Sequence, residues 1–151
     1  LMHQADVVVA TGGAGMVKSA YSSGKPAFGV GPGNVQTIID RGVDYEEAAE
    51  KVIAGRKFDN GIICSGEQSV IAQADEYDQV MKAFEKKGAY IIRNEEEKKK
   101  FRDTLFTDGH ITGSVVGQGV QELAGFAGVD IPEGTKVILT DSDNIGAREV
   151  L

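Results

Sequence analysis

The sequence has 151 residues, of which 41% are hydrophobic and 26% charged, and its net charge is −7. The length fits one domain with a core of its own, and the composition is that of a globular protein rather than a disordered one. The negative charge argues against nonspecific nucleic-acid binding, and no apolar run approaches the roughly 20 residues of a membrane-spanning helix. We therefore expect no nucleic acid and no membrane among its partners.

The chain has one cysteine, Cys64, and two histidines. One cysteine excludes an internal disulfide and fits a reducing compartment, so we expect a cytoplasmic protein. The same counts leave no cluster of recognisable metal-ligand spacing, and we expect no metal. Because the chain opens Leu1-Met2-His3-Gln4, a secretion signal upstream of it stays an open alternative.

The first elements predicted are a strand over residues 6–11 and a short helix over 16–21, joined by Gly12-Gly13-Ala14-Gly15. A strand, a glycine turn and a helix start present free backbone N–H groups to an anion. The spacing is neither G-x-G-x-x-G nor that of a P-loop. From these residues alone, a tight strand–helix connection is favoured over a phosphate site.

Residues 25–34 are a second glycine-rich loop, followed by a strand over 35–39. Its alternating glycines leave little side chain in the way, so a flat ligand could lie against this backbone. A bent or bulged edge segment is the alternative, and the sequence does not decide between them.

A helix begins at Asp44, with a capping box from Asp44 to Glu47. Turn residues 59–61 follow, and Ile62-Ile63 are expected to carry the backbone into the interior. Cys64 comes next, followed by the small residues Ser65-Gly66, so another molecule could approach its thiol. The alternative is a buried, inert cysteine, since a lone cysteine identifies a nucleophile only together with partners.

The rest of the chain alternates between predicted strands and helices, which favours an α/β fold with a mostly parallel, covered sheet. The charge run at 94–100 is interpreted as a solvated helix face, because its acids precede its bases. His110 is interpreted as a solvated loop residue without a catalytic role. The predicted strands are 68–72, 90–92, 114–117 and 136–140, and the helices are 75–87, one starting near 94, and 121–127.

Four motifs occur in order along the chain: Val9–Lys18, Ser22–Ala27, Val30–Asn34 and Phe58–Ser69. Together they resemble the aldehyde dehydrogenase superfamily, in particular its coenzyme-A-acylating branch and the aldehyde dehydrogenase half of bifunctional aldehyde–alcohol dehydrogenases. The resemblance extends over essentially the whole chain. It implies an aldehyde dehydrogenase-like catalytic domain over 25–151, preceded by the end of the NAD-binding domain over 1–24, in a fragment of a longer chain.

The resemblance also implies the site. Cys64 would be the nucleophile that attacks an aldehyde; hydride would pass to NAD, and the resulting thioester would go to coenzyme A. The turn at 12–17 would approach the phosphate and nicotinamide-ribose end of NAD, and Gly31 would lie beside the nicotinamide. Glu149 would bond the nicotinamide ribose, with a surface glutamate as the alternative. The implied cofactor-binding residues are Gly12, Gly13, Gly15, Gly31 and Glu149.

Val30 departs from the hydrolytic members of the superfamily, which place a glutamate at this position after Lys-Pro to activate water. Water is a poor nucleophile without a base, whereas a thiol supplies some thiolate unaided. Valine therefore predicts slow hydrolysis and a thioester that persists until coenzyme A takes the acyl group. Ala14, where relatives often have proline, is expected to change nothing in function.

The expected function is the reversible, NAD-dependent oxidation of a short-chain aldehyde, by default acetaldehyde, to acyl-CoA by a homo-oligomeric enzyme. Propionaldehyde and succinate semialdehyde are alternative substrates. A non-catalytic fragment or assembly module is the alternative from another class, and a hydrolytic dehydrogenase is disfavoured by Val30.

Overall fold

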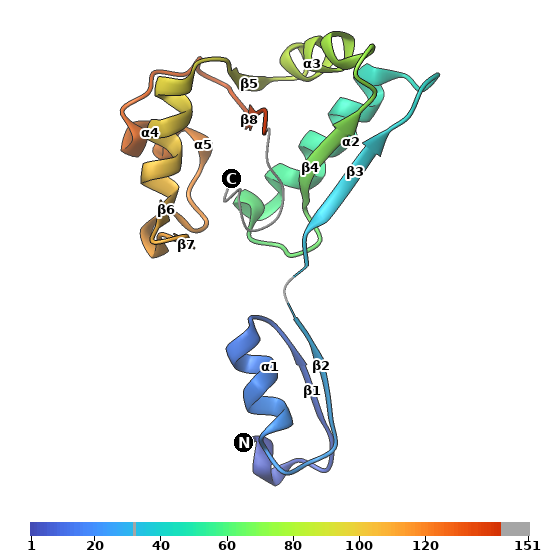
Figure 1. Cartoon of the computed structure of the whole chain (residues 1–151), viewed down its shortest axis with the longest axis vertical. Helices are drawn as coiled ribbons and strands as arrows, with labels where there is room; N and C mark the ends of the chain where they lie inside the picture. The colour runs from blue at the N-terminus through green and yellow to red at the C-terminus, as the bar shows by residue number, and fades with distance from the viewer. Residues whose placement is uncertain (32, 143–151) are drawn as a thin grey trace. The chain divides into compact units, whose positions relative to one another are not determined.

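The structure, a computed structural model, describes residues 1–31 and 33–142 (Figure 1). The chain forms two compact units, Leu1–Asn34 and Val35–Leu151. The predicted division after residue 24 falls inside the first unit. The assignment of these segments to a cofactor domain and a catalytic domain stays a prediction. Within the part of the chain that the structure describes, no helix is both long and apolar enough to cross a membrane.

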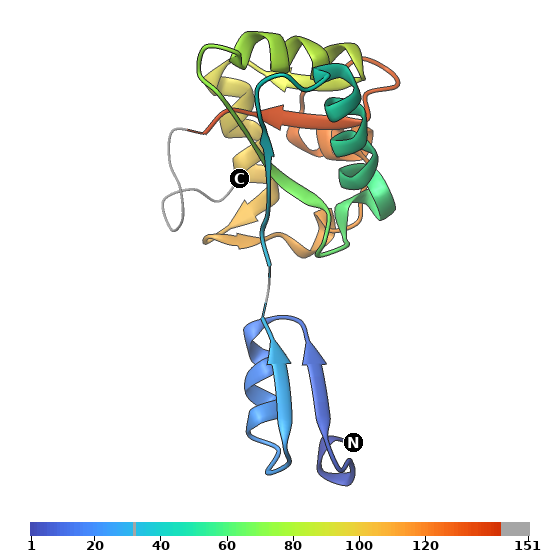
Figure 2. The same cartoon turned by 90° about the vertical axis from the view of Figure 1, so that its right-hand side faces the viewer.

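The first unit consists of β1 (Val8–Thr11), α1 (Ala14–Tyr21) and β2 (Ala27–Val30), after a short 3-10 helix η1 (Met2–Gln4). The two strands are parallel, and Figure 2 shows them side by side with α1 along one face. The predicted strand and helix are confirmed. The expected loop at 25–34 instead contains β2, because Ala27–Val30 pairs residue by residue with β1 and alternate side chains are half-buried. The buried residues of this unit are Val8, Ala10, Ala20 and Ser23.

Gly29 allows α1 to lie close to β2. A Cβ atom at this position would be 2.6 Å from Val17 Cγ1 and 2.8 Å from Tyr21 Cε2. The Gly29 N–H also donates a hydrogen bond to the Tyr21 hydroxyl at 3.0 Å. The glycines of this segment made β2 hard to predict from the sequence. At position 29, glycine is required by the packing of the helix on the strand.

The second unit begins with two strand–helix pairs. β3 (Val35–Ile39) lies parallel to β4 (Glu67–Ala72), and α2 (Tyr45–Lys57) packs against α3 (Tyr77–Lys86). A 3-10 helix, η2 (Phe58–Gly61), follows α2. The buried cluster that joins these elements comprises Ile39, Ala49, Val52, Ile53, Val80, Ala83, Phe84 and Val137.

The start of α2 is fixed by its N-cap. Asp44 Oδ1 accepts hydrogen bonds from the N–H groups of Glu46 at 2.9 Å and Glu47 at 3.1 Å. Glu47 Oε1 lies 2.7 Å from Lys51 Nζ, one helical turn further along. The Asp44 half of the predicted capping box is confirmed.

Several of the remaining elements contribute to a second cluster. They are β5 (Ala89–Ile92), α4 (Glu95–Leu105), β6 (Phe106–Thr107), β7 (His110–Ile111), η3 (Gly113–Val115), α5 (Val120–Ala127) and β8 (Val137–Thr140). The cluster comprises Ile92, Phe101, Ala124, Ala127 and Val129. The predicted strand at 114–117 is wrong. The Val115 N–H donates to the Thr112 carbonyl at 3.1 Å in a 3-10 turn, and Gly117 has a φ of +76°.

The charge run is the exposed face of α4, as predicted, with one exception. Asn94 caps the helix by accepting from the Glu97 N–H at 2.8 Å, and Lys100 pairs with Glu96 at 2.9 Å on the surface. Lys98 is instead 6% exposed, and its Nζ lies 3.2 Å from Asp141 Oδ1. This lysine ties α4 to the end of β8.

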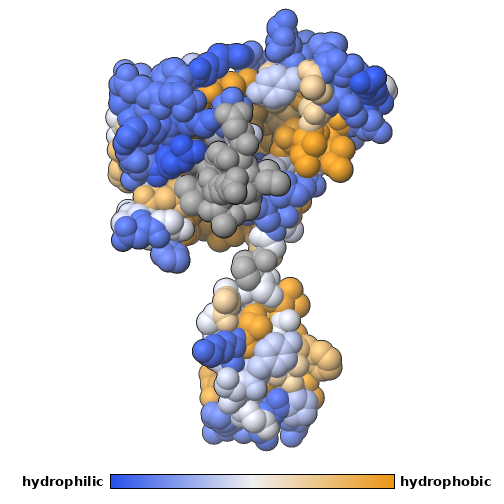
Figure 3. All heavy atoms as spheres, viewed as in Figure 1, coloured by the Kyte–Doolittle hydropathy of each residue, from blue (hydrophilic) through white to orange (hydrophobic). Residues whose placement is uncertain are grey.

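The α/β class with parallel strands is confirmed, since the pairs β1–β2, β3–β4 and β5–β8 are all parallel and β6–β7 is an antiparallel hairpin. In the described residues these strands form separate two-stranded sheets instead of one covered sheet. Ile38 and Ile71, opposite each other in β3 and β4, are 72% and 48% exposed. Figure 3 shows hydrophobic surface over these strands.

Candidate active site

Cys64 lies on the surface loop that joins α2 to β4, and it is exposed. The Gly66 N–H donates a hydrogen bond to the Ile63 carbonyl at 3.0 Å, so Ile63–Gly66 is a tight turn with Cys64 and Ser65 at its corners. The two corner residues of such a turn project away from its hydrogen bond. The thiol is therefore accessible to another molecule, and the alternative of a buried cysteine does not hold for the described residues. The role of Cys64 as a nucleophile stays a prediction.

The turn prediction before the cysteine is confirmed. Asp59, Asn60 and Gly61 have φ values of +49°, +50° and +75°, so three consecutive residues lie in the left-handed region. Asp, Asn and Gly are the residues that tolerate this conformation best. This run reverses the chain at the end of α2 and directs it toward the cysteine turn.

The expectation that Ile62 and Ile63 enter the interior is wrong, because they are 56% and 36% exposed. The loop is instead attached to Gly117. Asn60 Nδ2 donates to the Gly117 carbonyl at 2.9 Å, and a Cβ at Gly117 would be only 2.8 Å from Ile62 Cδ1. The loop lies on the surface, and the side chain of Ile62 lies beside Gly117 rather than in the core.

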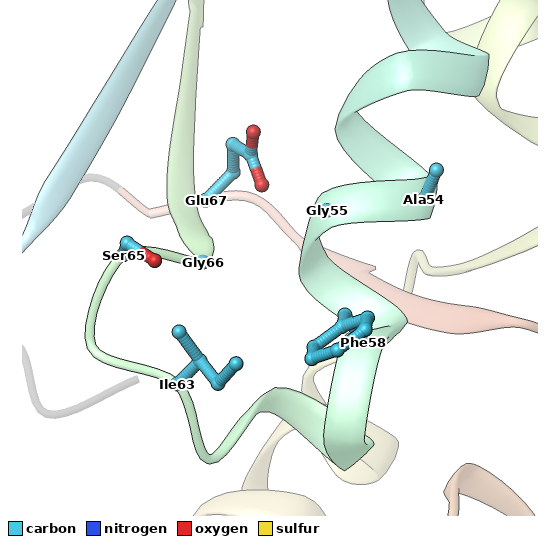
Figure 4. A pocket seen from close by; sticks show the side chains of 7 residues that line it. All are labelled: Ala54, Gly55, Phe58, Ile63, Ser65, Gly66 and Glu67. Atoms are coloured by element: carbon cyan, nitrogen blue, oxygen red, sulfur yellow. The ribbon is translucent and has the colours of Figure 1, made fainter.

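A pocket of about 240 Å³ opens on the inner side of this loop (Figure 4). Its lining includes Ile63 and Ser65, the two neighbours of Cys64, and Phe58 from the end of α2. Among the described residues that line it, Glu67 alone is ionisable. The full lining is Ala54, Gly55, Phe58, Ile63, Ser65, Gly66 and Glu67.

In the first unit, four glycines gather at one edge. β1 ends at Thr11, which pairs with Val30, and the Gly12 N–H donates to the Val30 carbonyl at 3.1 Å. Gly31 thus follows β2 at the carboxyl end of the strand pair, beside the turn that leads into α1. The carboxyl edge of parallel strands is where α/β proteins commonly bind ligands.

Three of these glycines are not explained by the fold. A Cβ built on Gly13, Gly15 or Gly31 would meet no described atom within 4 Å, and none of the three has a positive φ. Gly12 differs, since its Cβ would be 3.1 Å from Met16 Sδ. The N–H groups of the first helical turn lack intrahelical acceptors, so an open glycine turn here suits a phosphate-bearing ligand.

Comparison with known proteins places this geometry in context. No protein-family model matches the chain. The chain is 58% identical over 151 residues to an acetylating succinate-semialdehyde dehydrogenase of Clostridium kluyveri. It is 43% identical over 149 residues to an aldehyde-alcohol dehydrogenase of Clostridium acetobutylicum. The matches cover 100% and 99% of this chain but 33% and 17% of those proteins, so the chain spans a third or less of their length.

Solved structures with a similar fold are also aldehyde dehydrogenases or related acyl-CoA reductases by name. An acetylating aldehyde dehydrogenase from Geobacillus thermoglucosidasius matches 99% of this chain and 33% of its own, with a TM-score of 0.93 and 38% identity. By sequence and by fold, this chain is a relative of the acylating aldehyde dehydrogenases. An engineered glycolyl-CoA reductase with bound NADP+ matches with a TM-score of 0.88 and 30% identity, over 99% of this chain and 34% of its own. A Rhodopseudomonas palustris propionaldehyde dehydrogenase with bound CoA and an acylated cysteine matches with 0.85 and 31%, over 92% and 33%.

In this chain, the predicted site residues fall into three groups. Gly12, Gly13, Gly15 and Gly31 share one edge of the first unit, whereas Cys64 belongs to the second unit. Glu149 lies outside the described residues. His110 is exposed on the β6–β7 hairpin. Among the described residues, no three His, Cys, Asp or Glu side chains converge as metal ligands.

Two residues beside the cysteine loop were missed by the sequence analysis, namely Arg56 and Glu67. Both are half-buried, and each has one buried polar atom without a hydrogen-bond partner in the described structure, Arg56 Nη1 and Glu67 Oε2. One sign in the sequence could have revealed them. Gly55 lies inside α2, where glycine costs about 1 kcal/mol relative to alanine, and such a glycine commonly marks a close approach by another group.

Proposed function

We propose that the intact protein is an acylating aldehyde dehydrogenase, which converts a short-chain aldehyde, NAD and coenzyme A into acyl-CoA and NADH, reversibly. The observation that carries the proposal is the accessible thiol of Cys64 at the corner of a tight turn. The match of the entire chain to acylating aldehyde dehydrogenases supports it.

In the proposed reaction, the Cys64 thiolate adds to the carbonyl carbon of the aldehyde. A C–S bond forms, the carbonyl π electrons pass to oxygen, and the product is the oxyanion of a thiohemiacetal. When bound, the nicotinamide cofactor supplies the acceptor for the hydride that this carbon loses. A thioester then remains on Cys64 Sγ. The thiolate of coenzyme A attacks the acyl carbon and displaces the Cys64 thiolate, so acyl-CoA leaves and the nucleophile is regenerated.

We assign the cofactor to the open glycine edge of the first unit. Gly12, Gly13 and Gly15 would face its phosphate and nicotinamide-ribose end, with Gly31 beside the nicotinamide, and Glu149 would bond the ribose. The open space around Gly13, Gly15 and Gly31 supports this assignment. NAD is our choice. NADP is the competitor, since one structural neighbour is described with NADP+.

Val30 supports acyl transfer to a thiol over hydrolysis. Its side chain is 59% exposed at the end of β2, on the same edge as the glycine turn, and it has no group that accepts a proton from water. Because the position lacks a general base, we expect the thioester to survive until coenzyme A arrives.

Acetaldehyde is the default substrate, and succinate semialdehyde is the second candidate. Succinate semialdehyde is favoured by the 58% identity to an acetylating succinate-semialdehyde dehydrogenase. Propionaldehyde is favoured by structural neighbours that are named propionaldehyde dehydrogenases. The ratio of kcat/KM values for the three aldehydes, each measured with NAD and with NADP, decides both substrate and cofactor. We further propose that the reaction takes place in the cytoplasm, in a homo-oligomer.

Acyl transfer onto Cys64 tests the proposed function without any nicotinamide. Incubation of the intact protein with acetyl-CoA or succinyl-CoA should add one acyl group, and peptide mass spectrometry should find it on Cys64. Cys64→Ala should take up none. Equal acylation of wild type and Cys64→Ala would contradict the assignment. Absence of acylation with every acyl-CoA would favour a non-catalytic assembly module instead.

A further inference from the structure

The loop that carries Cys64 begins and ends beside two opposite charges. Arg56 lies in the last turn of α2, and Glu67 is the first residue of β4. Arg56 Nη1 and Glu67 Oε2 are buried, and neither atom has a hydrogen-bond partner in the part of the chain that the structure describes. Burial of unpaired charged groups is unfavourable, so their presence at both ends of one loop requires a reason.

The carboxylate of Glu67 lies directly against α2. Figure 4 shows this side chain extending from β4 toward the helix at Gly55. A Cβ at Gly55 would be 2.8 Å from Glu67 Cδ and would overlap the carboxylate. Glycine at this helical position therefore makes room for Glu67.

The guanidinium of Arg56 lies beneath the loop itself. A Cβ on Gly61 would be 3.0 Å from Arg56 Cζ, and a Cβ on Gly66 would be 4.0 Å from Nη1. Gly61 precedes the cysteine turn and Gly66 closes it. The guanidinium thus lies close to the loop on both sides of Cys64.

Arg56 and Glu67 also line one small pocket of about 60 Å³, together with core residues that include Val52 and Phe84. This volume has room for a water molecule that accepts from Arg56 and donates to Glu67. The pocket connects the base of the loop to the hydrophobic core, so the two charges act where the loop meets its rigid support.

We propose that Arg56 and Glu67 form a charge pair bridged by a water molecule in this small pocket, which holds the two ends of the loop together and so positions Cys64 for attack. This inference rests on the proposed function. Neither residue touches the reacting atoms; both act through the loop. Displacement of a nucleophile by about 1 Å can lower a rate by about 100-fold, so the pair affects the rate through the position of the loop.

The first test is kinetic and uses the intact protein. Glu67→Gln and Arg56→Gln should each lower kcat by about 10- to 100-fold, with a smaller change in KM, since the thiol is misplaced rather than lost. Arg56→Lys should restore most of the loss. Glu47→Gln is the matched control, because Glu47 is an exposed acid on the same helix, paired with Lys51. Its kcat should equal that of wild type.

A double variant tests whether the two charges act as a unit. The kcat of Arg56→Gln/Glu67→Gln should be no lower than that of the less active single variant, because the second substitution removes a partner that is already unpaired. A loss equal to the product of the two single losses would overturn the proposal, since it would show that the residues act independently.

Hydrogen exchange separates this inference from the proposed function. In Glu67→Gln, amide exchange should rise across residues 59–66 and stay unchanged in α4. If wild type proves inactive with every aldehyde but this rise is observed, the proposed function fails and the charge pair stands. If exchange in 59–66 is unchanged, the pair does not hold the loop, whatever the activity.

Discussion

At the residue scale, glycine occurs in this chain for two different structural reasons. Gly29 is required by packing, because any Cβ would collide with Val17 and Tyr21. Gly13 and Gly15 have open space around them and ordinary backbone angles. A glycine that the fold does not need, at the start of a helix, leaves its N–H groups accessible, and it is this accessibility that we connect with the cofactor.

Gly15→Ala tests that connection. Alanine is the better helix former by about 1 kcal/mol, so the free energy of unfolding should stay equal or rise by up to that amount. The KM for NAD should rise about tenfold, which corresponds to about 1.4 kcal/mol of lost binding. Gly29→Ala is the control with the opposite pattern, a loss of about 1–3 kcal/mol in stability from overpacking. An unchanged KM in Gly15→Ala would remove this turn from the cofactor site.

The accessible cysteine turn and the glycine turn could be predicted from the sequence, because both depend on residue types that lie next to each other along the chain. The catalytic role of Cys64 stays a prediction. The sequence did not predict Arg56 and Glu67. Their relation depends on how α2 and β4 pack, and eleven positions separate them along the chain, as their numbers show. The sequence also placed Ile62 in the interior, because the Gly117 segment beside this side chain is distant along the chain.

At the element scale, surface ion pairs connect the exposed sides of α2 and α3. Glu50 Oε2 lies 2.8 Å from Lys87 Nζ, just after α3, and Glu46 pairs with Lys86. The hydrogen bond and the charge of Lys87 lower the pKa of the Glu50 carboxyl below its ordinary value. The same pair raises the pKa of Lys87. Both shifts stabilise the folded state near neutral pH.

Glu50→Gln should therefore change how stability depends on pH. A carboxyl whose pKa is lowered by folding stabilises the protein above its unfolded pKa of about 4.3, and this contribution is lost as pH falls through the folded-state pKa. The variant should be slightly less stable than wild type at pH 7, and the two should converge in acid. Denaturant unfolding at pH 7, 5 and 3 measures this. A difference that grows toward acid would contradict the assigned pair.

Helices were easier to predict than strands in this chain. The helices have caps and amphipathic patterns that act locally, as Asp44 and Asn94 show. The strands depend on partners. β2 was missed because its glycines suggested a loop, and the valines at 115–116 suggested a strand where flanking glycines bend the chain into a 3-10 turn. The pairing of β5 with β8 could not be predicted, because it joins two strands that are far apart along the chain.

At the scale of the whole molecule, the two units differ in the cores they contain. The first has the small buried cluster Val8, Ala10 and Ala20, whereas Val9 and Phe28 on the same strands are 77% and 68% exposed. The second contains two larger clusters around α2–α3 and α4–α5. Chains below about 40 residues rarely bury enough surface to fold alone.

Residues 35–151 produced alone should therefore unfold cooperatively, with the helical circular dichroism expected of α2, α3 and α4. A peptide of residues 1–34 should show neither helical circular dichroism nor dispersed NMR signals. Cooperative folding of the peptide would mean that its stability comes from interactions not represented in the small cluster of Val8, Ala10 and Ala20.

We propose above all that Cys64 carries the acyl group from aldehyde to coenzyme A. The most direct measurement is NADH formation by the intact protein from acetaldehyde and from succinate semialdehyde, with and without coenzyme A, beside Cys64→Ala. We predict sustained turnover only with coenzyme A, and loss of more than about 1,000-fold in Cys64→Ala, as for other catalytic nucleophiles. Equal turnover without coenzyme A would show that water resolves the thioester, and the role given to Val30 would be wrong.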